Sequence, residues 1–203
     1  MAAAAWLTHY FVTEQKLAIP AGLMAALIVA ATPLAVYGLQ RTLGYWEFKT
    51  SYRSYHTHVD WRWIIMELGT LVVGAAVLWV WRLPFSVMPV AVTLWYMSMD
   101  IVPFLFGGES VYDWELRKLI SLYFGLAMTL LAFWIDLRSR ASRDYALWLY
   151  LFGVLTFWCG LTLMNSGTEL SKLAYCGINV LLILIGAVLA RRVFAVFGGL
   201  GVA

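Results

Sequence analysis

Charged side chains are scarce in this sequence. Asp, Glu, Lys and Arg together make up 12% of its 203 residues, against about 25% in soluble domains. Hydrophobic residues make up 63%, and the mean hydropathy is +0.81. This composition excludes a water-soluble globular fold. The net charge of +3 is spread through polar segments, so no nucleic-acid partner is indicated and the lipid bilayer is the expected environment.

Residues and motifs that carry common chemistry are also few. None of the three histidines falls within the long apolar segments, which argues against an intramembrane bis-histidine haem. Cys159 and Cys176 form no Cys-x-x-Cys motif and are interpreted as small buried hydrophobic residues. The sequence contains no Walker A, dinucleotide-binding, His-Glu-x-x-His or Gly-x-Ser-x-Gly motif. The residues therefore leave any cofactor unknown and do not decide whether the protein is an enzyme, although they favour a role other than catalysis.

The apolar residues gather in six segments, each long enough for a transmembrane helix of about 17–25 residues. Trp and Tyr crowd the ends of these segments, as in an interfacial aromatic belt. The prediction is an all-α integral membrane bundle that forms a single domain over residues 1–203. The six predicted spans are Leu17–Leu39, Trp63–Trp81, Leu83–Phe106, Leu119–Ile135, Tyr145–Met164 and Leu173–Ala190.

The two ends of the chain are shorter apolar segments. Met1–Val12 lacks a basic region and a cleavage site, so it is interpreted as an interfacial or loosely packed helix and not as a signal peptide. Val193–Ala203 has about half the length of a span. It could be a half-helix packed in the bundle or the start of an incomplete seventh span. The second interpretation is favoured, and a partial seventh helix of that kind is expected to be poorly anchored or held by a neighbouring chain.

The distribution of positive charge gives little information on orientation. The 14 basic residues divide equally between the two predicted sides of the membrane. Dense basic clusters in short segments, at Leu137–Arg143 and Arg191–Arg192, favour a cytoplasmic N-terminus.

Two acidic residues, Glu67 and Asp100, fall inside predicted spans. A charge in hydrocarbon is costly, so such residues usually mark a functional site. The two spans flank a short break at Arg82, which predicts a tight antiparallel hairpin. At a rise of 1.5 Å per residue, Glu67 lies about 22 Å and Asp100 about 27 Å from that break. The two acids are therefore expected on facing surfaces near the same membrane face, as an ion or solute site. Structural ion pairing within the bundle is the alternative.

A second candidate site lies in the polar segment before the second span. His56, His58 and Asp60 alternate along the chain, so an extended segment would point all three side chains the same way. Imidazole and carboxylate groups suit zinc, copper or iron. A metal site is one hypothesis for these residues, and a solvated or interfacial loop is the other.

Two parts of the sequence carry a family resemblance. Trp95–Gly107, which reads Trp-Tyr-Met-Ser-Met-Asp-Ile-Val-Pro-Phe-Leu-Phe-Gly, and Tyr145–Val202 resemble a family of uncharacterised bacterial polytopic membrane proteins, a domain of unknown function. The resemblance runs from the first span to the end of the chain. It implies a bacterial inner membrane and further helices after the segment matching Arg192–Val202, but no activity, substrate or catalytic residue.

Three functions remain open on these observations. The leading hypothesis is a membrane protein with a polar, acidic cavity that handles a cation, a proton or a small polar solute through Glu67 and Asp100. The second is a non-catalytic accessory or assembly subunit, with a protein partner or a homo-oligomer. The third is a membrane-embedded metalloenzyme that uses His56, His58 and Asp60.

Overall fold

The computed structural model describes residues 1–45, 61–106, 112–138, 144–164 and 167–202, except the side chains of 102–106 and 112–113. Every regular element in these ranges is helical, which confirms the all-α prediction. The elements are α1 (Ala2–Thr13), α2 (Ala18–Thr42), α4 (Trp61–Trp81), the 3₁₀ helix η1 (Pro84–Ser86), α5 (Val87–Phe106), α6 (Tyr112–Arg138), α7 (Ala146–Leu163), α8 (Glu169–Val188) and α9 (Arg192–Val202).

Five helices in the described part of the chain are long and apolar enough to cross a membrane: α2, α4, α6, α7 and α8. The chain is thus a multi-pass membrane protein. The remaining predicted span corresponds to α5, whose side chains are described only as far as Ile101, and it is not among the five. The predicted start of that span, Leu83, is wrong. Pro84 opens a separate 3₁₀ turn, and α5 begins at Val87.

Helix α6 is longer than the predicted span Leu119–Ile135. Its 27 residues extend about 40 Å, whereas the hydrocarbon core is about 30 Å thick. Both polar ends of α6 thus reach beyond the hydrocarbon while remaining helical. Arg117, Lys118 and Asp136, which the sequence places in connecting segments, therefore lie on this helix.

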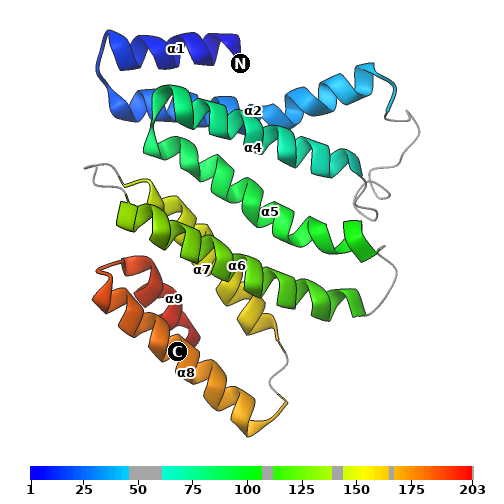
Figure 1. Ribbon diagram of the computed structural model, residues 1–203, viewed down its shortest axis with the longest axis vertical. Coiled ribbons are helices and arrows are strands. Elements are labelled where there is room, and N and C mark those ends of the chain that lie inside the picture. Colours follow the sequence, from blue (N-terminus) through cyan, green and yellow to red (C-terminus); the bar gives the residue numbers. More distant parts are fainter. Residues whose placement is uncertain (46–60, 107–111, 139–143, 165–166, 203) are drawn as a thin grey trace.

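The helices form an elongated layer that follows chain order from α1 to α6, with α7 packed on α6 and α9 lying between that pair and α8 (Figure 1). The N-terminal pair α1 and α2 occupies one end of the layer, and the pair α8 and α9 occupies the other. Extensive packing joins helices that are close along the chain, such as α2 with α4 and α6 with α7. Helix α2 is bent midway, and it contains Pro33, which cannot donate the backbone hydrogen bond to residue 29.

Two apolar cores hold this layer together. One is formed by buried residues of α1, α2 and α4 with Leu83. The other joins α5, α6, α7, α8 and α9 around Tyr150, which is 1% exposed. The acidic site lies beside the first core, and a polar network borders the second.

The short helices at the two ends are both packed. Helix α1 buries Ala4 and Thr8 against the bundle and leaves Trp6 exposed. Helix α9 packs on α8 and α7 and buries Phe194 and Gly198. The expectation that the segment from Val193 is poorly anchored, or needs a neighbouring chain to hold it, is therefore wrong.

A close backbone approach explains the anchoring of α9. A Cβ atom placed on Gly198 would lie 2.6 Å from the backbone oxygen of Asn179 in α8, and one on Gly201 would lie 2.0 Å from the Asn179 Oδ1 atom. A larger residue does not fit at position 198, where the neighbouring atom is backbone, and at position 201 it would have to displace the Asn179 side chain. The two glycines let α9 return along α8 with almost no gap.

Candidate acidic site and polar network

Glu67 and Asp100 line one cavity of about 350 Å³ between α2, α4 and α5. Helix α4 contributes Glu67, and α5 contributes Asp100. The two carboxyl groups lie close enough to interact. The other lining residues are Ala30, Pro33, Trp63, Met66, Thr70, Met88, Pro89, Val92, Thr93 and Tyr96.

The hairpin between α4 and α5 brings these two acids together. Helix α4 ends at Trp81, and Arg82 follows with a φ of 49°, in the left-handed region that terminates helices. The chain then reverses through η1 into α5. Glu67 precedes Arg82 by 15 residues and Asp100 follows it by 18, so both lie toward the same end of the hairpin.

Glu67 is the more buried of the two acids. It is 9% exposed, whereas Asp100 is half-buried. The Glu67 Oε2 atom is fully buried and has no hydrogen-bond partner among the described residues. An unpaired polar atom in such a place costs about 1–3 kcal/mol, so this oxygen has capacity for a proton or a bound cation.

The threonine hydroxyl groups in the cavity wall do not donate a hydrogen bond to the Glu67 Oε2 atom. Thr70 donates to the Met66 carbonyl at 2.7 Å, and Thr93 donates to the Pro89 carbonyl at 2.8 Å, each within its own helix. The carboxyl pair is therefore the chemically distinctive part of an otherwise apolar cavity.

A positive charge acts on Asp100 from the next helix. Arg117 of α6 is half-buried, and its charge interacts with the Asp100 carboxylate. Its Nε atom is buried without a hydrogen-bond partner in the described part of the chain. Among the described residues, the charges that act on this pair are thus the two acids themselves and Arg117.

The proposed metal ligands His56, His58 and Asp60 lie outside the described residues. Within the described ranges, no three His, Cys, Asp or Glu side chains gather in a way that could hold a metal ion. The metal-site hypothesis therefore stays a prediction.

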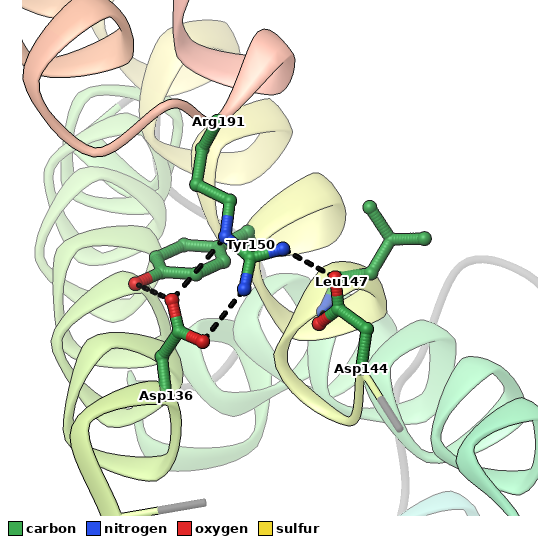
Figure 2. A network of polar contacts seen from close by, with 5 residues as sticks. All are labelled: Asp136, Asp144, Leu147, Tyr150 and Arg191. Atoms are coloured by element: carbon green, nitrogen blue, oxygen red, sulfur yellow. Dashed lines mark hydrogen bonds and ion pairs between the residues drawn. The ribbon is translucent and has the colours of Figure 1, made fainter. Parts of the chain in front are cut away.

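A polar network lies at the other end of α6 (Figure 2). Arg191, between α8 and α9, donates through Nη2 to Asp136 Oδ1 at 2.6 Å and through Nε to Asp136 Oδ2 at 3.2 Å. It also pairs with Asp144, just before α7. The Tyr150 hydroxyl donates to Asp136 Oδ2 at 3.4 Å, and the Arg191 guanidinium lies 5.7 Å from the centre of the Tyr150 ring. One arginine thus connects the α8–α9 pair to the ends of α6 and α7.

The two aspartates hold Arg191 in its charged form. Burial acts to lower the pKa of this guanidinium, but its hydrogen bonds to Asp136 and Asp144 outweigh that effect, so the pKa lies above its usual value. Asp144 also accepts from the Leu147 backbone N–H at 3.1 Å, in the first turn of α7. The network therefore orders a helix start and a helix connection together.

In the sequence, Arg191 stands out only as part of a basic cluster that indicates the orientation of the chain in the membrane. Its network with Asp136 and Asp144 is not predicted. The relevant signal was present, because the segment Asp136–Asp144 and the pair Arg191–Arg192 fall on the same side of the predicted topology. Asp136 and Arg191 are 55 residues apart, however, and no local spacing rule connects them.

Comparison with protein-family models, with curated proteins and with solved structures finds no match to this chain.

Proposed function

We propose that this multi-pass membrane protein exchanges a proton for a monovalent cation at the cavity between α2, α4 and α5. The observation that carries the proposal is that Glu67 and Asp100 line one cavity and interact there, and that the Glu67 Oε2 atom is buried without a partner among the described residues. Intramembrane acids of this kind often serve as proton or ion sites.

A hydrogen bond between the two acids requires a proton. Ionised carboxylates only accept hydrogen bonds, so a hydrogen bond between two carboxyl groups needs one of them to be protonated. The pair is expected to share a single proton, as closely spaced acids do in other proteins.

The charge balance favours exchange with a monovalent cation. With one shared proton, Glu67, Asp100 and Arg117 together carry no net charge. Loss of the proton leaves one negative charge in a low-dielectric cavity, which is unfavourable unless it is neutralised. A single Na⁺ or K⁺ ion restores neutrality, and the free Glu67 oxygen supplies a ligand of the type that such cations prefer.

The location and orientation of the protein complete the proposal. The family resemblance at Trp95–Gly107 supports a bacterial inner membrane. The clustering of Arg138, Arg191 and Arg192 on one side supports a cytoplasmic N-terminus. In that orientation the acidic cavity lies toward the outer face of the membrane.

Labelling with dicyclohexylcarbodiimide tests the proposal directly, because this reagent modifies protonated carboxyl groups in apolar surroundings. The purified chain in liposomes should be modified at Glu67 or Asp100, as detected by mass spectrometry of the peptides. NaCl or KCl should reduce the modification relative to choline chloride at the same ionic strength. Glu169, whose side chain is 87% exposed on the same side, is the internal control and should stay unmodified.

A flux measurement then separates binding from transport. Liposomes that contain a pH-sensitive dye should show proton movement when a Na⁺ or K⁺ gradient is imposed, and Glu67→Gln should abolish it. Labelling that does not respond to either cation, together with equal proton movement in the Glu67→Gln variant, would leave only a structural role for the pair.

A further inference from the structure

A second cavity, of about 250 Å³, lies between the α6–α7 hairpin and helix α8. We call it the α6–α8 groove. Extensive packing connects α8 to α9 and α9 to α7, whereas α6 and α8 face each other across the groove. The lining residues are Leu126, Thr129, Leu130, Phe133, Tyr150, Val154, Phe157, Ile178, Leu181, Leu182, Ile185, Leu189 and Phe194.

The walls of this groove are suited to an apolar occupant. The Thr129 hydroxyl donates to the Gly125 carbonyl at 2.8 Å, and the Tyr150 hydroxyl points to Asp136 (Figure 2). A buried water needs two to four polar partners, which these walls do not offer. Leu130 and Leu181, on opposite walls, are 58% and 53% exposed, so the groove is open to the surrounding membrane.

One end of the groove lies at the Arg191 network. Tyr150 belongs to both, and Leu189 precedes Arg191 by two residues. Two further arginines lie close along the chain to the residues at this end. Arg138 follows Asp136 by two residues, and Arg192 follows Arg191 directly.

Arg138 and Arg192 differ from Arg191 in their charge environment. Asp136 and Asp144 neutralise Arg191. Arg138 and Arg192 are exposed and form no ion pair within the described residues, and Arg138 stacks on the Trp134 ring at 5.2 Å. An apolar groove with two unneutralised cations at its end matches an acyl chain that carries an anionic headgroup.

We propose that the α6–α8 groove binds one anionic phospholipid. An acyl chain fills the space between Leu130 and Leu181, and the phosphate lies at Arg138 and Arg192. The site is independent of the acidic cavity, since it uses different helices and the other end of α6.

Native mass spectrometry of the detergent-purified chain, titrated with phosphatidylglycerol or with phosphatidylcholine of the same acyl chains, tests this site. Phosphatidylglycerol should be retained preferentially. Arg192→Gln should weaken its retention about five-fold, the value expected for one arginine near a lipid surface. Lys16→Gln is the matched control, because it removes one exposed charge from the same predicted side, at the α1–α2 connection, and should have no effect.

A second pair of variants tests whether an acyl chain occupies the groove. Leu130→Trp places a large side chain in the groove and should abolish retention, whereas Leu131→Trp changes the neighbouring residue, which does not line the groove, and should not. Equal retention of the two lipids, equal effects of Arg192→Gln and Lys16→Gln, or equal effects of the two tryptophan variants would each overturn the proposal. A dimer that forms without bound lipid and is broken by Leu130→Trp would assign the groove to a second copy of the chain instead.

Discussion

Gly125 of α6 lies directly against the backbone of Phe157 in α7. A Cβ atom at Gly125 would be 2.2 Å from the Phe157 nitrogen and 2.7 Å from the Gly153 carbonyl oxygen. Both neighbours are backbone atoms, which cannot turn aside as a flexible side chain can. The close contact of these two helices therefore depends on a missing methyl group, as in other transmembrane pairs with small residues at the interface.

Gly125→Ala should destabilise the α6–α7 hairpin by roughly 1–3 kcal/mol, because the added methyl group forces the two backbones apart. Gly177→Ala is the matched control, since a Cβ atom there meets nothing within 4 Å. The control should be neutral or slightly stabilising. Unfolding of both variants in mixed detergent micelles measures the difference, and equal stability would contradict the close approach.

Gly201→Ala should loosen α9, since its methyl group would displace the buried Asn179 side chain, which donates from Nδ2 to the Tyr175 carbonyl at 2.9 Å. Faster hydrogen exchange of the α9 amides is the expected result. Gly199→Ala has open space around it and should exchange like the wild type. Combining Gly201→Ala with Asn179→Ala should restore part of the protection, because the clash partner is then gone. If the protection does not recover, the clash between residue 201 and Asn179 is not the cause of the faster exchange.

Arg191→Gln should destabilise the protein by about 1–3 kcal/mol, because Asp136 and Asp144 lose the cation that neutralises both. The loss of stability is no larger because the three side chains are 23–40% exposed, and solvent weakens ion pairs between exposed groups. Lys172→Gln breaks an ion pair to Glu169 whose side chains are 58% and 87% exposed, and it should cost less than about 0.5 kcal/mol. Similar thermal shifts for the two variants would show that the Arg191 network adds nothing beyond a surface pair.

The contact between Glu67 and Asp100 predicts a measurable coupling. Glu67→Leu and Asp100→Leu, introduced singly and together, should give a coupling energy within the 0.5–3 kcal/mol typical of residues in direct contact. Glu67→Gln should be milder than Glu67→Leu, since its amide can still donate to Asp100. Additive effects of the two leucine substitutions would mean that the carboxyl groups do not touch.

The approach of Glu67 and Asp100 follows from rules that can be read in a sequence. Two apolar segments with a break at Arg82 form a hairpin, and the rise per residue then fixes the depth of each acid. The start of α5 was missed by four residues because Pro84 begins a 3₁₀ turn before the helix. Leu83 is apolar whether it lies in a span or in a turn, so hydropathy alone does not locate that boundary.

Other contacts depend on tertiary packing that has no local pattern. Hydropathy falls at Arg117 and predicts a connecting segment there, yet α6 includes this residue. The Arg117 charge acts on Asp100, which the sequence does not predict. The contacts of Asn179 in α8 are a second example. A polar residue in a span suggests a hydrogen bond to another helix, but its amide donates within α8 while its oxygen faces Gly201.

The side-by-side order of the helices has a consequence for biogenesis. Because the extensive packing joins helices near one another along the chain, such as α1 with α2, α4 with α5 and α8 with α9, each helix leaving the ribosome finds its partner already in the membrane or arriving next. Low sequence separation between partners favours fast assembly. The layer can therefore grow from its N-terminal end one hairpin at a time, and Arg191 is made after both of its aspartate partners and fixes the last pair to the rest.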